Sequence, residues 1–306
     1  MVQNKSLPSK IFVFLNTTLM TTLVIMTFYP FYYAFINSLN HGQDTINLGY
    51  VLLVPRYFTT ASWVTVLNDP AIVRAIYITV ARTVLVTISS IFITSMFAYA
   101  FSRPYLRWKK VYATLGFISM YISGGLIAFF LLISVLGLYN NFWVYVIPSM
   151  FGGFFQVIIF SSNFKGLPDS LFESAKLDGA SEFKIYTWIV IPLSKAVIAA
   201  LSVFTAVGTW NDFQTTLFFT DGVSINTLQY YIVQLVRHAN AVEQLMASAA
   251  GADGQILGML QQAGGPASAR TVELAAMVIA AIPILLLYPF AQRHFAQGVL
   301  IGSIKG

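Results

Sequence analysis

Polar side chains are scarce in this chain, and the group with the most distinctive chemistry stands at residues 210–214, where a long apolar run ends. Aromatic faces stack on sugar rings, and amide and carboxylate groups offer the directional hydrogen bonds that hydroxyl groups require. These residue types fit a solute path about as well as they fit helix packing. The candidates are Trp210, Asn211, Asp212, Phe213 and Gln214, followed by Tyr121, Tyr139 and Asn140 as weaker ones.

Arg82 is a second polar residue within an apolar run. A charged side chain that faced lipid would be costly, so Arg82 must find an opposite charge, reach the membrane interface or line a solute cavity. A structural ion pair or an interfacial position explains it better than a solute cavity.

No group of residues in the sequence indicates catalysis or cofactor binding by this chain. The motif Gly-x-x-x-x-Gly-Lys-Ser/Thr, whose backbone cradles ATP phosphates, does not occur. His41, His238 and His294 are far apart and lack metal-ligand spacing, and there is no cysteine. We therefore expect no cofactor on this chain and no enzymatic activity.

The elements that position the polar residues are predicted to be membrane helices. The chain has 306 residues, of which 57% are hydrophobic and 9% are charged, and its mean hydropathy is +0.74. Soluble domains carry about 25% charged residues. Residues 111–164 contain no Asp, Glu, Lys or Arg. Because a crossing helix needs roughly 20 mainly apolar residues, this run has room for two spans and a turn.

Apolar runs predict six transmembrane helices, and hence an all-α polytopic membrane protein with a single transmembrane domain over residues 1–306. The first run is interpreted as a retained span, since its uncharged stretch is longer than a signal-peptide core of about 7–15 residues. The outer segment 37–75 contains prolines and aromatic residues and could form a small structured cap. The predicted spans lie near 12–36, 76–101, 111–136, 143–164, 192–217 and 273–292.

The basic residues predict that both termini are cytoplasmic. With that orientation the inner segments hold twelve of the 17 Lys and Arg residues, the outer segments hold four, and Arg82 lies in a span. This excess obeys the positive-inside rule. It also explains the net charge of +6 without nucleic-acid binding. The inner residues are Lys5, Lys10, Arg103, Arg107, Lys109, Lys110, Lys165, Lys176, Lys184, Lys195, Arg293 and Lys305; the outer ones are Arg56, Arg74, Arg237 and Arg270.

The inner loop of residues 165–191 predicts a short helix, a glycine break and a second short helix. Pro168 suits a first helical turn, and Gly179 is a natural helix terminator. Ser170 and Glu173 have the spacing of a capping box. On spacing alone, an ordinary amphipathic helix on the membrane surface explains this loop as well as a functional element does.

The residue types of the loop shift that balance. The sequence Glu173-Ser174-Ala175-x-x-Asp178-Gly179-Ala180, followed by Ile191-Pro192-Leu193, closely resembles the EAA motif of the membrane subunits of ABC importers. Two positions depart from the motif, because Ser174 replaces its first alanine and Ala196 replaces a proline usual four residues after Pro192. Neither departure touches the Asp-Gly-Ala centre.

The resemblance extends over nearly the whole chain. Six spans with both ends inside is the plan of the family, as in the shorter permease of the maltose importer. Trp210-Asn211 is similar to a Trp-Asn pair that follows the EAA loop in carbohydrate-uptake permeases. Residues 295–306 look like the C-terminus of the subgroup linked to uptake of complex oligosaccharides.

The resemblance implies an ATP-driven importer of a carbohydrate, with an oligosaccharide favoured, in the bacterial cytoplasmic membrane. In this family the EAA loop docks in a cleft of a cytoplasmic ATPase subunit, and transport proceeds by alternating access. The implied partners are a second homologous permease, two ATPase subunits and an extracellular solute-binding protein. The implied coupling residues are Glu173, Ala175, Asp178, Gly179 and Ala180.

Two other functions stay open at this point. A secondary transporter or channel would also be polytopic, although that class often shows internal repeats and charged or broken spans at the membrane midplane, and no repeat is found here. An ABC importer for a solute other than a sugar would carry the same EAA motif.

Overall fold

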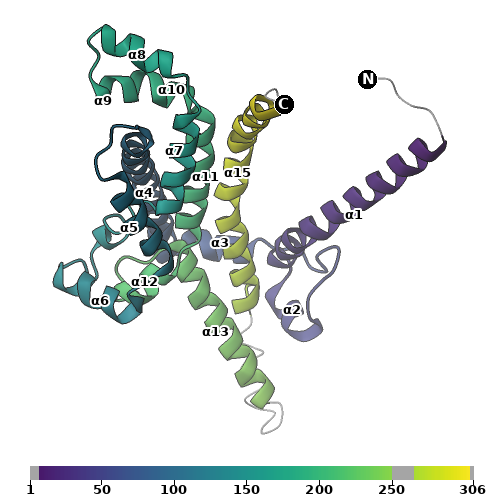
Figure 1. The fold of residues 1–306 in the computed structure, drawn as a ribbon. Coiled ribbons are helices and arrows are strands. Elements are labelled where there is room, and N and C mark those ends of the chain that lie inside the picture. The colour runs from purple at the N-terminus through teal and green to yellow at the C-terminus, as the bar shows by residue number, and fades with distance from the viewer. Residues whose placement is uncertain (1–6, 250–264, 304–306) are drawn as a thin grey trace. The chain divides into compact units, whose positions relative to one another are not determined.

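The computed structural model describes residues 7–249 and 265–303 (Figure 1). Regular structure in these residues is helical, apart from one isolated antiparallel bridge between Asn40 and Phe58, which confirms the all-α prediction. The chain divides into two compact units, and each is described by itself. Unit 1 comprises Met1–Pro70 and Gln234–Ala281, and unit 2 comprises Ala71–Val233 and Ile282–Gly306.

Three helices are long and apolar enough to cross a membrane. They are α1 (Leu7–Ser38), α4 (Pro70–Ser102) and the Ala269–Leu287 part of α15 (Ala269–Ser303). Two further pairs of helices pass the same test only together, and each pair is bent at a short break. The described residues therefore hold three candidate spans, or up to five if each bent pair is one span. A sixth span and the sidedness of the termini stay predictions.

The predicted span 111–136 is not one straight helix. Its two helices, α5 (Lys109–Tyr121) and α6 (Gly125–Val135), are bent by 112° relative to each other. Gly125 takes a φ of +77° at the start of α6, a conformation that glycine adopts without steric cost. Because the intervening Ser and Gly residues carry no charge, hydropathy alone does not reveal this break.

The predicted span 143–164 is helical over only part of its length. It begins with a 3-10 turn, η1 (Phe142–Val144), and further turns, and α7 (Phe154–Lys165) follows. The 12 residues of α7 rise about 18 Å, which is less than the roughly 30 Å of the hydrocarbon layer. Pro148 and the glycines 152 and 153 account for the irregular part, because proline removes a backbone donor and glycine lowers helix propensity.

The inner loop and the next span form the second bent pair. The segment Glu182–Leu193 and α11 (Lys195–Asn211) are bent by 84° relative to each other. The predicted span 192–217 ends as a continuous helix at Asn211, and α12 (Gln214–Phe219) begins after a short break. The loop elements are α8 (Asp169–Leu177), α9 (Glu182–Ile185), the π-helix η2 (Tyr186–Val190) and α10 (Ile191–Leu193).

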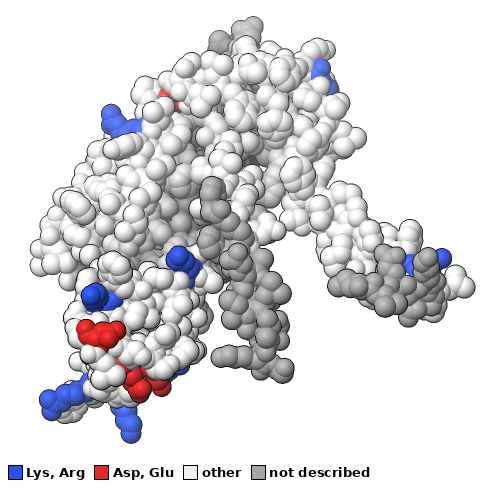
Figure 2. Space-filling view, turned by 90° about the horizontal axis from the view of Figure 1, so that it is seen from above, with Lys and Arg blue, Asp and Glu red and all other residues white. Residues whose placement is uncertain are grey.

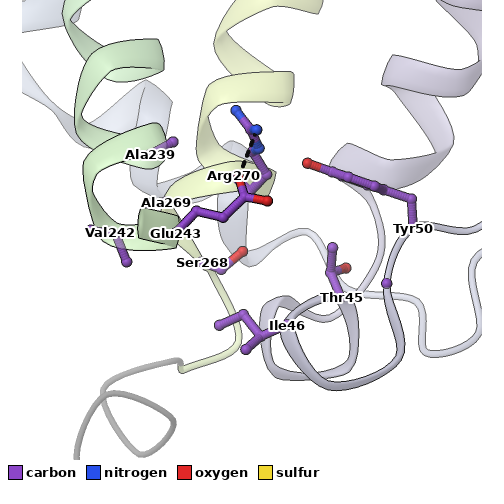
Figure 3. A pocket seen from close by; sticks show the side chains of 10 residues that line it. Thr45, Ile46, Tyr50, Ala239, Val242, Glu243, Ser268, Ala269 and Arg270 are labelled. Carbon is purple, nitrogen blue, oxygen red and sulfur yellow. Dashed lines mark hydrogen bonds and ion pairs between the residues drawn. The ribbon is translucent and has the colours of Figure 1, made fainter. Parts of the chain in front are cut away.

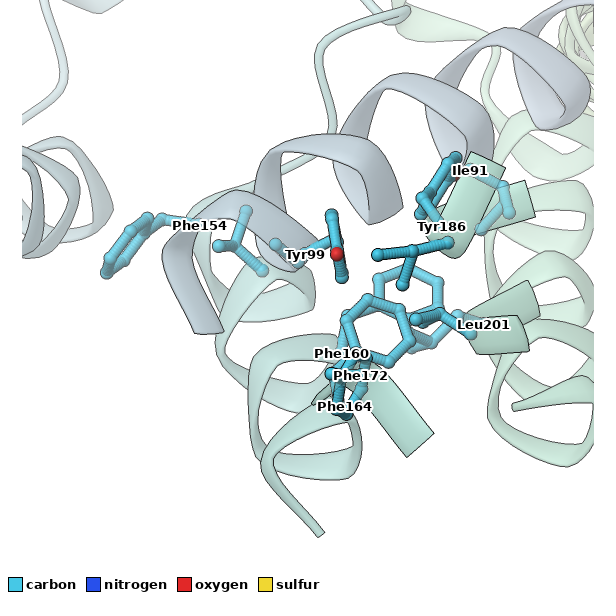
Figure 4. Close-up of a cluster of buried hydrophobic side chains, with 12 residues drawn as sticks. Ile91, Tyr99, Phe154, Phe160, Phe164, Phe172, Tyr186 and Leu201 are labelled. Carbon is cyan, nitrogen blue, oxygen red and sulfur yellow. The ribbon is translucent and has the colours of Figure 1, made fainter. Parts of the chain in front are cut away.

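An apolar cluster in unit 2 ties the loop elements to α4 and α7. Phe160 and Phe164 of α7 have no exposed surface. Phe172 from α8 and Tyr186 from η2 enter the same cluster, as Figure 4 shows. One face of the loop is therefore packed into the core of unit 2. The buried members are Ile91, Ala98, Tyr99, Phe154, Val157, Phe160, Phe164, Phe172, Ile185, Tyr186, Val190 and Leu201.

Unit 1 contains α1, α2 (Gly42–Leu48), α3 (Ala61–Asn68) and the adjoining parts of α13 (Leu228–Ala249) and α15. The segment 37–75 is structured, as predicted for a cap. Asp44 accepts hydrogen bonds from Asn40 Nδ2 at 2.8 Å and from Arg56 Nε at 2.7 Å. Burial opposes ionisation of Asp44, but these hydrogen bonds and the charge of Arg56 hold its pKa below the ordinary value.

Candidate coupling loop and solute path

The inner loop folds as a helix, a glycine turn and a second helix, as the sequence predicts. Gly179 is exposed and takes a φ of +74°, and its amide donates to the Lys176 carbonyl at 3.0 Å. The amide of Ala180 donates to the Ala175 carbonyl at 2.9 Å. These two bonds satisfy carbonyls at the end of α8. Gly179 therefore serves the turn, because only a glycine takes this backbone conformation without strain.

The start of α8 differs from the predicted capping box. The helix begins at Asp169, after Pro168 in an extended conformation, and no side chain caps it. Ser170 consequently lies inside the helix, where it cannot act as the cap. The capping side chain belongs to the next helix, because Ser181 Oγ accepts a hydrogen bond from the Lys184 amide at 3.4 Å at the start of α9.

The motif residues divide into an outward and an inward set. Glu173 and Asp178 are exposed, and neither carboxylate forms an ion pair within the described part of the chain. Ala175 and Ala180 are partly buried and pack against the apolar cluster of unit 2. Figure 2 shows a largely uncharged face on which several acidic and basic side chains lie close together in one part and further charged side chains are scattered elsewhere. The loop thus presents unpaired carboxylates while its small residues face the core.

Glu182 joins the loop to the end of α4 through a compact polar cluster. Its carboxylate accepts hydrogen bonds from the hydroxyls of Tyr99 at 2.6 Å and Tyr105 at 2.8 Å. Lys176 Nζ lies 2.9 Å from the same carboxylate and stands over the Tyr105 ring, 4.4 Å from its centroid. The hydrogen bond to Glu182 raises the pKa of Lys176 above its ordinary value. Three chain segments are therefore held together at this carboxylate.

Arg103 makes a second connection between α4 and the loop. Its guanidinium carbon lies 4.0 Å from the centroid of the Phe172 ring on α8. It donates to the Phe164 carbonyl at 3.1 Å and to Ser102 Oγ at 2.9 Å. Only 6% of Arg103 is exposed, so its charge is compensated by these carbonyl, hydroxyl and aromatic partners. A movement of α8 would therefore displace Arg103 at the end of α4.

Arg82 and Asp212 form an ion pair within unit 2. Arg82 Nη2 lies 2.5 Å from Asp212 Oδ2, and only 3% of the arginine side chain is exposed. The guanidinium stands over the Tyr145 ring, 4.7 Å from its centroid. Thr215 Oγ1 donates to the same carboxylate at 2.6 Å. An ion pair was one of the two structural explanations favoured for Arg82, and this one joins residues 130 positions apart in the chain.

The other residues of 210–214 do not share one environment. Trp210 is buried and lines a largely apolar cavity of about 220 Å³ formed by α4, α11 and α15. Phe213 is partly buried, whereas Asn211 and Gln214 are exposed. Asn211 Oδ1 accepts a hydrogen bond from Gln229 at 3.2 Å. Of the predicted solute-path residues in this group, only Asn211 and Gln214 present exposed polar groups.

The weaker solute-path candidates lie elsewhere. Tyr121 is 83% exposed at the end of α5. Asn140 has a φ of 50° and donates to Asp221 Oδ2 at 2.9 Å. Backbone amides of Val223 and Ser224 also bind Asp221 and lower its pKa to about 2. Asn140 thus helps to hold the loop around Asp221 in place through this hydrogen bond.

A cavity of about 240 Å³ in unit 1 is bounded by α2, α13 and the start of α15 (Figure 3). Arg270 at its wall donates to Glu243 at 2.9 Å and to Glu273 at 2.8 Å. Tyr50 and Ser268 complete the lining. Because one guanidinium is shared between two carboxylates, its charge is already compensated. The ion pairs connect α13 to the start of α15.

Comparison with known proteins decides the family. No protein-family model matches the chain. The chain is 32% identical over 277 residues to the polygalacturonan/rhamnogalacturonan transport system permease protein YtcP of Bacillus subtilis (strain 168), which covers 90% of this chain and 92% of that protein. It is 33% identical over 281 residues to Protein LplC of the same organism, with 92% and 90% covered. The chain belongs to the carbohydrate ABC-importer permeases.

The fold of the permease agrees with this assignment. It resembles a chain in the crystal structure of a bacterial ABC transporter involved in the import of the acidic polysaccharide alginate. The TM-score is 0.80 at 25% identity, and the match covers 95% of this chain and 98% of that chain. The permease is therefore a multi-pass protein of the cytoplasmic membrane and a transport subunit, not an enzyme. The secondary-transporter alternative is wrong, because these relatives are subunits of ABC transporters.

Several contacts of the permease's loop escape prediction from sequence. Glu182 lies outside the EAA motif, and its partner Tyr99 is 83 positions away. Arg103 counts in the sequence only as one of the inner basic residues, although its partner Phe164 is 61 positions away. No local pattern marks such pairs. Leu177, by contrast, is 89% exposed beside Asp178. An apolar residue at the polar end of a helix is a local pattern from which the sequence could have indicated a further functional residue of the loop.

Proposed function

We propose that this permease forms half of the translocation path of an ATP-driven oligosaccharide importer that works by alternating access. The names of its relatives support the solute class, since YtcP is named for polygalacturonan and rhamnogalacturonan and the alginate transporter for an acidic polysaccharide. ATP and Mg bind to partner ATPase subunits. ATP-driven closure of those subunits opens the path outward, and hydrolysis resets it inward.

In this proposal six spans cross the membrane and both termini are cytoplasmic. The bent pair of α5 and α6 counts as one span, α11 supplies another, and α7 with the turns before it supplies the sixth. The permease pairs with a second homologous permease, two ATPase subunits and an extracellular solute-binding protein. The excess of Lys and Arg in the inner segments supports the sidedness.

The loop 165–191 is proposed as the coupling element that docks on an ATPase subunit. The carrying observation is its two-sided construction. Glu173 and Asp178 face outward without an ion pair to a described residue, while Phe172 is buried in the core of unit 2. Exposed carboxylates can bind basic groups or helix N-termini of a partner. A push on the outer face is therefore passed to α4 and α7 through packed side chains.

Charge reversal at the outer face tests this role. Asp178→Lys should leave the permease in the membrane, reduce the ATPase that co-purifies with it and abolish uptake. Asp169→Lys is the matched control, because it reverses a carboxylate of the same helix outside the motif. Equal uptake in Asp178→Lys and the unaltered permease would remove the coupling role from this loop.

The solute path is proposed to run along Asn211 and Gln214, near Trp210, Asp212 and Phe213, with Tyr121 as a more distant candidate. The exposed amides support this, since sugar hydroxyls need directional hydrogen bonds. Loss of one such bond costs about 0.5–1.5 kcal/mol, so Gln214→Ala should slow uptake per assembled complex about two- to tenfold.

If glycans do not stimulate ATP hydrolysis by the assembled transporter and another solute does, the importer serves a non-sugar solute.

A further inference from the structure

A cavity of about 510 Å³ opens in unit 2 beside the inner end of α4, where residues 103–108 lead into α5. Its lining is aromatic and basic. Tyr105, Trp108 and Tyr112 contribute rings, and Arg103 and Arg107 contribute guanidinium groups. Such a lining fits a ligand that has a compact negative charge beside an apolar part.

The positive charge available in this cavity belongs to Arg107. Arg107 is exposed, and it forms no ion pair with a described residue. Arg103 is already held by Ser102 and Phe164. Glu182 is the one acidic residue that the described lining contains, and its charge is compensated by Lys176 at 2.9 Å. The cavity therefore offers one unpaired guanidinium, and the acid at its wall does not cancel it.

Trp108 makes the rim of the cavity unusual. It has a φ of 61°, in the left-handed region that bulky side chains rarely enter, and 72% of it is exposed. Strained residues of this kind are found at ligand clamps and functional loops, where the surrounding structure maintains them. An exposed indole directly before α5, the first helix of a bent candidate span, also matches the belt in which Trp and Tyr meet lipid headgroups.

We propose that this cavity binds the phosphate headgroup of an anionic phospholipid in the leaflet that contacts the inner end of α4. Arg107 binds the phosphate through paired N–H donors, and the rings of Trp108 and Tyr112 cover the glycerol and the first acyl carbons. Basic pockets at the cytoplasmic ends of membrane helices are suited to such headgroups. The choice of the inner leaflet rests on the proposed topology, whereas the site itself does not.

The cavity shares Tyr99, Tyr105 and Glu182 with the cluster that joins the coupling loop to α4. A bound headgroup would therefore stand against the hydroxyls that hold Glu182. Tyr99 and Tyr105 already donate hydrogen bonds to Glu182 without the lipid. A bound lipid would therefore only restrict the movement of these side chains further. Lipid composition should consequently affect how firmly the loop is connected to α4.

The test measures lipids retained by the purified transporter complex in nanodiscs that contain phosphatidylcholine and phosphatidylglycerol. Bound lipids are counted by native mass spectrometry for the unaltered complex, Arg107→Gln, Trp108→Asn and the control Lys110→Gln. Lys110 is exposed and basic and stands near Arg107 in sequence, but it does not line the cavity. Asn tolerates a left-handed backbone, so Trp108→Asn removes the ring without changing the charge. Complex yield and melting temperature show whether each variant is assembled.

The expected result is selective retention of phosphatidylglycerol that falls about tenfold or more in Arg107→Gln, because a charged hydrogen bond is lost. Lys110→Gln should lose at most about fivefold, the effect of one basic residue near an anionic surface. Trp108→Asn should also lower retention severalfold. Equal losses in both basic variants together with no loss in Trp108→Asn would mean diffuse attraction and would overturn the site.

Two further outcomes also count against the proposal. If inorganic phosphate or glycerol phosphate binds the detergent-free complex with the same dependence on Arg107, the ligand is a free phosphate and the lipid source is wrong. If phosphatidylglycerol is not preferred over phosphatidylcholine, no headgroup site exists. Nanodiscs expose both leaflets, so neither outcome depends on sidedness. Uptake by the reconstituted transporter reports separately on the proposed function.

Discussion

Removal of one partner of the Arg82–Asp212 ion pair should destabilise unit 2 strongly. Asp212→Ala leaves a guanidinium of which 3% is exposed without its counter-charge. Breaking a buried pair in this way costs about 3–5 kcal/mol, because the remaining charge stays buried and uncompensated. Thr215 also loses the acceptor of its hydroxyl, at a cost of about 0.5–1.5 kcal/mol. Asp212→Ala should therefore lower the yield of assembled complex.

The double variant separates the value of the pair from the cost of an orphaned charge. Replacing both residues, as Arg82→Met with Asp212→Leu, removes both charges, and such replacements of buried pairs are often neutral. It should recover most of the yield and melting temperature that either single variant loses. For yield and melting temperature, Asn211→Ala is the matched control, because Asn211 stands next to Asp212 in the sequence and its side chain is exposed.

The assay is the thermal unfolding of the purified complex, together with uptake per assembled complex. A structural pair predicts reduced yield in Asp212→Ala with unchanged uptake per complex. If the double variant is as unstable as the two single losses added together, the charges do not compensate each other and the reasoning is refuted. If uptake per complex falls while yield is unchanged, Asp212 acts on the solute and not on the fold.

Three further predictions concern the loops of the permease. Gly179→Pro should abolish uptake, because its φ of +74° and its amide hydrogen bond are both incompatible with proline; normal uptake would show that the turn is dispensable. Glu182→Ala should raise amide hydrogen exchange in α9, since two tyrosine hydroxyls lose a charged acceptor at about 1.5–3 kcal/mol each. Lys176→Ala, which removes an exposed ion pair worth about 0–1 kcal/mol and the contact with the Tyr105 ring, is the control and should change less; equal exchange in both would contradict the cluster. Because the folded-state pKa of Asp221 is lowered to about 2, its stabilising effect is present above the unfolded value of about 3.9 and is lost as pH falls toward 2. Amide protection at Ser224 should thus persist at about pH 4 and vanish in Asp221→Ala, and loss of protection already at about pH 5 would disagree.

Much of the architecture can be derived from the sequence because the bilayer imposes one simple requirement. Apolar runs must be helical in lipid, since backbone groups there have no water to bind. The runs that became α1, α4 and the first part of α15 are long enough for hydropathy to decide. The helix, glycine turn and helix of the loop were also predictable, because a positive φ at Gly179 is a local property.

Interruptions within apolar runs were harder to predict. Ser123, Gly124 and Gly125 add no charge, so a bend of 112° between α5 and α6 leaves hydropathy almost unchanged. The predicted cap of α8 was wrong for a similar reason, because the backbone conformation of Pro168 makes the helix begin at Asp169, before Ser170. In both places backbone conformation, and not residue polarity, decided the outcome.

The long-range partners were decided only by the tertiary structure. The sequence shows that Arg82 needs a counter-charge, but any acidic residue could have supplied it. The tertiary structure brings Arg82 of α4 to Asp212 at the end of α11, 130 positions away. Glu182 likewise meets Tyr99 and Tyr105 only because the inner loop folds back on α4. Residue types determine which interactions a side chain requires, whereas the partner depends on which helices lie side by side, and that follows from packing summed over the whole chain.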